Sequence, residues 1–319
     1  MELSFAPMEG VTYPEYRRVH ARMFPGADRY YTPFIAPDPK GCFKGAAMRG
    51  VLPENNTGVA LVPQLLINSA APFLEAAKQL ADLGYTELNL NVGCPSGTVT
   101  AKHKGAGMLA DLEALDRCLE EIFTRCPLKI SVKTRLGYAS AAEFPAILAV
   151  YRKYPLSLLI VHARDRAGMY RSRPDLDAFS LALEDSPFPV AYNGDLFSPA
   201  DVQALAARFP GLRGAMLGRG AICDPALFRR IRGGAPLTGE ELRTFHDALA
   251  EAYLASGLAP AHTAARMKEL WYYLRCLFPG ADREVKTILK SRTLPDCRAA
   301  ADALLSSRKL EPGACFHPQ

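Results

Sequence analysis

The sequence has no long apolar segment. No run of apolar residues approaches the roughly 20 that span a bilayer. The first five residues, MELSF, lack the basic start and apolar core of a secretory signal peptide. We therefore expect a chain that begins at Met1, stays in the cytoplasm and has no membrane partner.

Disulfide and metal-binding motifs are absent as well. The eight cysteines include no Cys-x-x-Cys pair, and the six histidines show no metal-ligand spacing beside them. A disulfide framework is not expected in a cytoplasmic chain of 319 residues. We predict no metal site, and a reactive cysteine has to be recognised from its neighbours.

Neither sign of charge dominates. The chain has 38 Lys and Arg against 33 Asp and Glu, a formal net charge of +5. This mildly basic balance permits a polyanionic partner without requiring one. Composition therefore leaves open both a metabolic enzyme and an enzyme that acts on nucleic acid.

Short β-rich runs alternate with longer amphipathic segments, which is typical of parallel βα units. Strands are predicted at residues 3–7, 30–35, 59–65, 87–92, 129–134, 158–162, 190–193 and 215–218. Eight such units in roughly 230 residues match the size of a TIM barrel. The first strand ends in APMEG (6–10), which is not the glycine-rich turn of a dinucleotide-binding sheet. We predict an α/β fold, a TIM (β/α)8 barrel.

A cluster of helix-breaking residues, RGGAP at 232–236, follows the eighth unit. Beyond it, helices are predicted at residues 239–255, 260–278, 283–291 and 295–306. We therefore divide the chain into a catalytic barrel at 1–234 and a small C-terminal helical domain at 235–319.

Polar and glycine-rich segments gather at the predicted C-terminal ends of the strands, where TIM barrels carry their chemistry. Lys133 and Arg135 are two apart on one strand and share a face. Lys133 follows apolar residues, and a buried lysine needs an anionic partner. The segments at 193–195 (NGD) and 218–220 (GRG) end neighbouring strands and together predict a bound phosphate ester.

Six segments in this order resemble the tRNA-dihydrouridine synthase family. They are APMEG (6–10), NLNVGCP (89–95), VKTRLG (132–137), IVHAR (160–164), NGD (193–195) and AMLGRG (215–220). The resemblance covers about residues 3–232, and the helical tail also fits the layout of the family. It implies FMN as prosthetic group and NADPH as the usual reductant.

Carried over by motif position, the resemblance also implies site residues. The implied cofactor-binding residues are Pro7, Met8, Glu9, Gln64, Lys133, His162, Asn193, Gly194, Asp195, Gly218 and Arg219. Among them, Gln64 would bind the pyrimidine edge of the flavin, and Lys133 would lie near N1 and O2. His162 would hold the ring or the phosphate arm.

The implied reaction reduces the C5=C6 bond of uridine in tRNA to 5,6-dihydrouridine. Hydride passes from flavin N5 to C6, and Cys94 gives a proton to C5. A thiol suits this task because its reference pKa of about 8.5 keeps it mostly protonated at neutral pH. Asn91 would bind the uracil edge, and Arg135 would contact the base or a phosphate.

The predicted tail carries two candidate RNA-binding surfaces. Lys286 and Lys290 lie with Arg283 on one helix face. Arg266, Lys268, Trp271, Tyr272 and Arg275 form the other, although Trp271 fits a core position equally well. We expect a monomer whose partner is tRNA.

Three other functions stay open at this point. One is an FMN-dependent reductase or dehydrogenase of a free pyrimidine, of the dihydroorotate or dihydropyrimidine dehydrogenase type. The second has ribosomal RNA in place of tRNA as the substrate. The third is an RNA-binding relative without turnover, which the complete set of cofactor residues disfavours.

Overall fold

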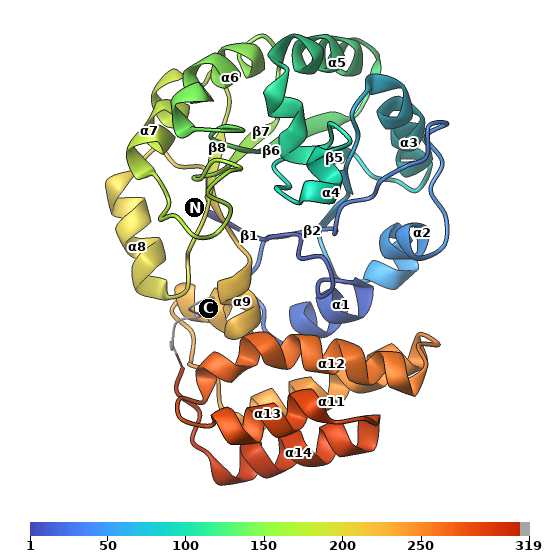
Figure 1. Ribbon diagram of the computed structural model, residues 1–319, viewed down its shortest axis with the longest axis vertical. Helices are drawn as coiled ribbons and strands as arrows, with labels where there is room; N and C mark the ends of the chain where they lie inside the picture. Colours follow the sequence, from blue (N-terminus) through green and yellow to red (C-terminus); the bar gives the residue numbers. More distant parts are fainter. Residues whose placement is uncertain (313–319) are drawn as a thin grey trace.

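The protein forms an all-parallel barrel with helices around it, in a computed structural model that describes residues 1–312 (Figure 1). The strands are β1 (Glu2–Phe5), β2 (Arg29–Tyr31), β3 (Leu61–Val62), β4 (Gln64–Leu65), β5 (Glu87–Val92), β6 (Lys129–Arg135), β7 (Leu158–His162), β8 (Val190–Asn193) and β9 (Gly214–Leu217). The prediction of a TIM barrel followed by a helical region is confirmed.

The barrel closes at Pro63. In the sheet order β3-β2-β1-β9-β8-β7-β6-β5-β4, the two end strands are neighbours in the chain. Proline has no N–H to donate to a ladder, but its carbonyl accepts a bond from the Asn89 backbone N–H at 2.9 Å. The predicted strand at 59–65 is therefore divided in two, with β3 paired to β2 and β4 paired to β5.

Both faces of the strands are covered, as parallel sheets require. Every residue of β7, β8 and β9 is buried. The barrel interior holds fully buried polar side chains, Gln64, Asn89 and Ser131. It also holds an apolar cluster of Ala6, Tyr31, Val62, Leu158, Ile160, Ala191 and Met216. The interior is thus a packed core, and a ligand can enter only above it.

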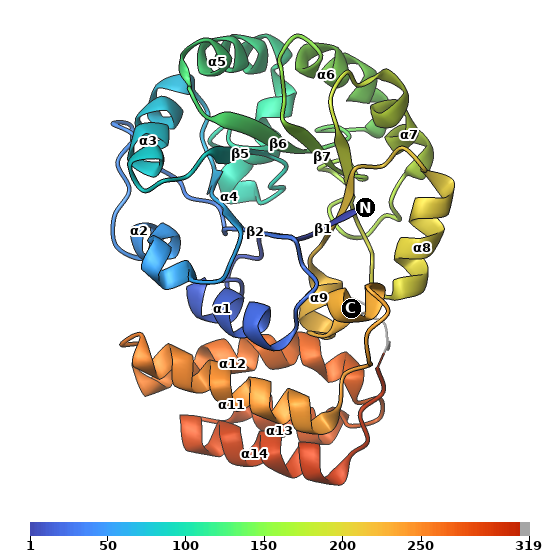
Figure 2. The same cartoon turned by 180° about the vertical axis from the view of Figure 1, so that it is seen from behind.

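Helices surround the barrel in both views (Figure 2). They are α1 (Pro14–Met23), α2 (Ala46–Val51), α3 (Ala70–Asp82), α4 (Gly97–Thr100), α5 (Leu112–Arg125), α6 (Phe144–Tyr151), α7 (Leu176–Asp185), α8 (Pro199–Arg208), α9 (Arg219–Cys223) and α10 (Leu227–Ile231). Side chains satisfy the first backbone N–H groups of several helices. Asp111 caps α5, and Ser198 forms a capping box with Asp201 at α8.

The C-terminal region is helical, as predicted. It consists of α11 (Gly239–Ala255), α12 (Pro260–Leu274), α13 (Asp282–Lys290) and α14 (Leu294–Ser307), which lie beside α1 and α9 (Figure 1). Trp271 is fully buried here, so its assignment to an RNA-binding surface is corrected. Arg266 donates to the Gly10 carbonyl at 2.6 Å, and this contact fixes α12 to the loop after β1.

No helix among residues 1–312 has the length and apolar character to cross a membrane.

Candidate active site

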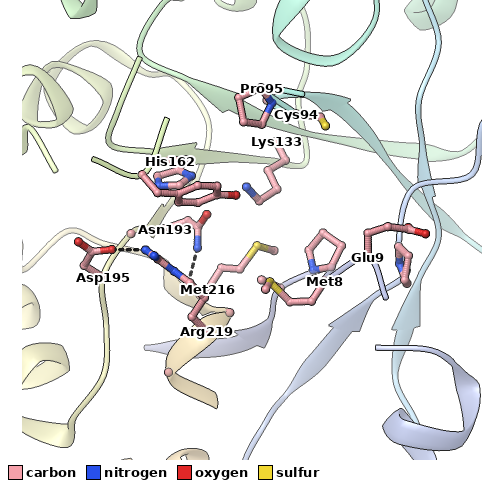
Figure 3. A pocket seen from close by; sticks show the side chains of 18 of the residues that line it. Met8, Glu9, Cys94, Pro95, Lys133, His162, Asn193, Asp195, Met216 and Arg219 are labelled. Carbon is pink, nitrogen blue, oxygen red and sulfur yellow. Dashed lines mark hydrogen bonds and ion pairs between the residues drawn. The ribbon is translucent and has the colours of Figure 1, made fainter. Parts of the chain in front are cut away.

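A cavity of about 410 Å³ opens at the C-terminal ends of the strands (Figure 3). Fourteen residues that sequence reasoning selected line it: Pro7, Met8, Glu9, Gln64, Asn91, Cys94, Lys133, Arg135, His162, Asn193, Gly194, Asp195, Gly218 and Arg219. The structure therefore brings the predicted catalytic and cofactor residues into one place. Lys286 and Lys290 lie apart from it, exposed on α13.

The side-chain amino group of Lys133 has no hydrogen-bond or ion-pair partner among residues 1–312. Its side chain leaves the middle of β6, and the amino group ends in the open part of the cavity (Figure 3). Burial and the nearby charge of Arg135 lower the pKa of Lys133 to about 7. An ammonium in this setting is stabilised by an anion, so the cavity is suited to a negatively charged ligand.

Cys94 is half-buried in the loop after β5. Burial raises the pKa of its thiol above the usual value, although Lys133 and Arg135 act in the opposite direction. The thiol is therefore protonated at neutral pH, as an acid has to be.

The loop that carries Cys94 is held by two independent contacts. Asn91 Oδ1 accepts from the backbone N–H groups of Gly93 at 3.0 Å and Cys94 at 2.9 Å. Gly105 packs behind the loop with a φ of 56°, and a Cβ at this position would lie 2.9 Å from the Cys94 Cβ. The thiol is thus presented by a fixed backbone.

A chain of side-chain hydrogen bonds joins β4, β5 and β6 at the cavity. Asn91 Nδ2 donates to Gln64 Oε1 at 2.7 Å, and Gln64 Nε2 donates to Asn89 Oδ1 at 2.8 Å. Asn89 Nδ2 then donates to Ser131 Oγ at 3.0 Å. These bonds fix the orientation of the Gln64 amide, which is fully buried.

Arg135 lies in the cavity wall with most of its side chain engaged by the protein. Its Nε donates to the Gly93 carbonyl at 2.9 Å, and Nη1 donates to the carbonyls of Asp165 and Met169 at 2.8 and 3.0 Å. Arg135 therefore joins the Cys94 loop to the loop after β7, a task that the sequence did not indicate.

Asp195 links two arginines at the opposite end of the cavity. Arg219 Nη2 donates to Asp195 Oδ1 at 2.6 Å, and Arg164 binds both carboxylate oxygens. Asn193 Nδ2 donates to the Met216 carbonyl at 2.8 Å and ties β8 to β9 (Figure 3). The result is a fixed polar wall with a net positive charge.

Comparison with known proteins agrees with this geometry. The model of the dihydrouridine synthase family matches residues 4–259. A probable tRNA-dihydrouridine synthase of Rhodobacter capsulatus is 30% identical over 78% of this chain and 78% of its own length. A tRNA-dihydrouridine(16) synthase of Cupriavidus necator is 31% identical over 82% of this chain and 81% of its own.

The chain belongs to the dihydrouridine synthase family. The predicted family and, with it, the predicted class of enzyme, an oxidoreductase, are confirmed.

Solved structures with the same barrel include an old yellow enzyme homologue from Zymomonas mobilis. Its TM-score is 0.55 at 12% sequence identity, over 74% of this chain and 90% of that one. The old yellow enzyme from Trypanosoma cruzi has a TM-score of 0.54 at 10% identity, over 79% of this chain and 93% of that one. At such low identity these likenesses concern the fold.

Sequence reasoning did not place aromatic side chains in the cavity. Tyr170 comes from the loop after β7 and lies near two guanidinium groups, 5.4 Å from that of Arg135 and 4.7 Å from that of Arg219. Tyr272 and Tyr273 reach the cavity from α12. The spacing of strands carries no signal for these residues, although Tyr272 had been noted as a candidate for RNA contact.

Proposed function

We propose that this protein is a tRNA-dihydrouridine synthase that reduces the C5=C6 bond of uridine in tRNA, with FMN as prosthetic group and NADPH as reductant. The observation that carries the proposal is the presence, in one cavity, of a buried lysine whose amino group has no partner among residues 1–312 and a protonated cysteine. Family membership supports the reaction, because the family is named for it.

The donor set fits FMN. Lys133 would hold the electron-rich N1–O2 side of the ring, with Gln64 at the pyrimidine edge and Pro7, Met8 and Glu9 beside it. Arg219, with the backbone at Gly194, Asp195 and Gly218, would hold the phosphate, and Asn193 and His162 would border the arm that joins the two. When bound, FMN supplies the hydride that is added to C6 of uracil.

Cys94 would complete the reduction by giving its thiol proton to C5. Transfer by a positioned acid is worth about 10²- to 10⁴-fold in rate. Asn91 and Arg135 would serve this step in two ways, by fixing the Cys94 loop and by bordering the uracil ring. The proton is lost from Sγ and a C–H bond forms, so the thiolate must regain a proton from solvent before the next turnover.

The helical domain at 235–319 would bind the RNA. The target uridine has to leave its stack to reach a cavity of this kind. Lys286 and Lys290 are exposed on one face of α13 and are free to contact phosphates. Binding through phosphates makes the affinity for RNA strongly dependent on salt.

Mapping of dihydrouridine in RNA from cells with and without the gene tests this function. We expect loss of dihydrouridine at defined tRNA positions without the gene, and recovery with the wild-type gene but not with the Cys94→Ala variant. Loss of dihydrouridine only in ribosomal RNA would show that ribosomal RNA, and not tRNA, is the substrate. An unchanged dihydrouridine map would contradict the proposed function.

A further inference from the structure

Arg164 lies behind the cavity and is not among the residues assigned to the cofactor or the substrate. It lies two residues beyond the end of β7, is 3% exposed and does not line the cavity. Its Nε donates to the Ser172 carbonyl at 2.6 Å, and Nη1 donates to Asp195 Oδ1 at 3.0 Å. Arg164 therefore joins the loop that holds Tyr170 to the acidic residue of the site.

The remaining contact of Arg164 is with His162. Arg164 Nη1 lies 3.2 Å from His162 Nε2. A guanidinium has only donors to offer, so His162 Nε2 must accept. A neutral imidazole with an acceptor at Nε2 carries its proton on Nδ1, and the contact thus selects one of the two tautomers.

His162 Nδ1 has no hydrogen-bond partner in the part of the chain that the structure describes, and the ring lines the cavity. The charged groups that face the ring are Arg135 and Lys133 from β6, Arg164, and Arg219 from α9. Burial and these four positive charges hold the pKa of His162 well below its usual range. The ring stays neutral and offers one N–H to a ligand.

We propose that Arg164 is a positioning residue that fixes His162 as a hydrogen-bond donor through Nδ1. The ligand atom that His162 binds is then an acceptor, a carbonyl oxygen or an anionic oxygen. His162 takes no part in proton transfer, because its Nε2 lone pair is used by Arg164 and its Nδ1 proton is not acidic. Cys94 is left as the acid of the site.

The tautomer can be measured directly by NMR in protein labelled with ¹⁵N-histidine. Absence of one signal in the His162→Asn variant assigns the resonance. In the wild type we expect the Nδ1–H tautomer, with no titration between about pH 5 and 8. An Nε2–H tautomer, or a ring that titrates in this range, would overturn the proposal.

Arg164→Met should release the ring, so that the Nε2–H tautomer becomes populated. Asp195→Asn is the matched control. It removes the charge partner of Arg164 but leaves the guanidinium beside His162, and the Nδ1–H tautomer should persist. An unchanged tautomer in Arg164→Met would mean that Arg164 serves only to hold the loop and Asp195.

Two amide variants of His162 provide the second readout. Asparagine places an N–H near the position of Nδ1, whereas glutamine places it near that of Nε2. We expect His162→Asn to have about tenfold higher kcat for RNA reduction than His162→Gln, the effect of one hydrogen bond. Equal rates, or the reverse order, would contradict the donor role.

Only the kinetic readout rests on the proposed function. If the wild-type protein reduces no RNA, the function fails while the NMR measurement still decides the tautomer.

Discussion

Arg29 and Lys133 lie at opposite ends of the barrel and are stabilised in different ways. At the N-terminal end of the strands, Arg29 lies 3.0 Å from a Glu2 carboxylate oxygen and 2.6 Å from one of Glu87. At the C-terminal end, Lys133 is more deeply placed and has no carboxylate partner among residues 1–312. A single strand, β6, runs from the exposed Lys129 at the first end to Lys133 near the second.

This difference separates residues that stabilise the fold from residues that serve a ligand. A charged side chain that is paired with carboxylates of the same chain needs no ligand to stabilise it. A half-buried ammonium without a partner lowers the stability of the folded state until an anion binds. The same barrel can therefore be stable at one end and reactive at the other.

Removing the proposed acid, Cys94, has the largest expected effect. Cys94→Ala should lower the rate of RNA reduction by at least about 10²-fold, because proton transfer to C5 loses its donor. Reduction of bound FMN by NADPH should not change. Cys42→Ala, a variant at an exposed cysteine, is the control, and a similar loss in that variant would show that the effect is not specific to the site.

Removing the amino group of Lys133 is expected to have the next largest effect. Lys133→Met should weaken FMN retention by roughly tenfold or more, since a charged hydrogen bond is worth about 1.5–3 kcal/mol. Lys129→Met changes the other end of β6 and should leave retention unchanged. Equilibrium dialysis against FMN measures both variants, and full retention in Lys133→Met would remove the lysine from the cofactor site.

Replacement of the exposed lysines of α13 should weaken the binding of RNA and leave the binding of FMN unchanged. Replacing both Lys286 and Lys290 by alanine should weaken tRNA binding by several-fold and reduce the salt dependence by about one phosphate contact for each lysine. The double variant Lys78→Ala/Lys129→Ala removes the same net charge at exposed positions outside α13 and serves as the control. Unaltered salt dependence in the double variant would exclude this face from the RNA contact.

The titration of Lys133 should appear in the stability of the FMN-free protein. Its pKa is about 7 when folded, against an ordinary value of 10.5. Between these two pH values the unfolded chain binds more protons than the folded one. The free energy of unfolding should therefore rise with pH from about 7 toward 10.5. Urea unfolding should show that slope, and Lys133→Met should lack it. Equal slopes in the two proteins would argue against a shifted lysine.

The smallest effect is expected at the paired end. Glu87→Gln should lower the free energy of unfolding by about 1 kcal/mol, because a partly exposed ion pair contributes little. Its kcat and its FMN retention should match the wild type. A tenfold loss of activity would mean that the two ends are not independent.

The barrel and its site could be predicted because both follow from local patterns. Apolar runs mark strands, and polar residues at their ends mark a candidate site, so the positions of Lys133 and Cys94 in the cavity could be anticipated from the sequence. The role of Cys94 came from the family resemblance and stays a prediction. The division of the third strand at Pro63 was not predicted, because it depends on the strands that pair with it on both sides of the closed barrel. The tautomer of His162 likewise depends on a contact with Arg164 that no spacing rule contains.

Residues from loops and from the tail were the hardest to place. Tyr170, Tyr272 and Tyr273 reach the cavity only after the loop and α12 have packed against the barrel. Trp271, next to Tyr272 in the chain, points into the core instead. The direction of a side chain on a helix depends on packing, which composition does not reveal.

The central claim is that the C-terminal end of the barrel transfers reducing equivalents from bound FMN to uridine in tRNA. An anaerobic mixing experiment with the NADPH-reduced protein tests it most directly. We predict that unmodified tRNA restores the absorbance of oxidised FMN and gains dihydrouridine in equal amount, whereas free uracil does neither. Reoxidation of FMN by free uracil, or no reoxidation of FMN by tRNA, would contradict the account.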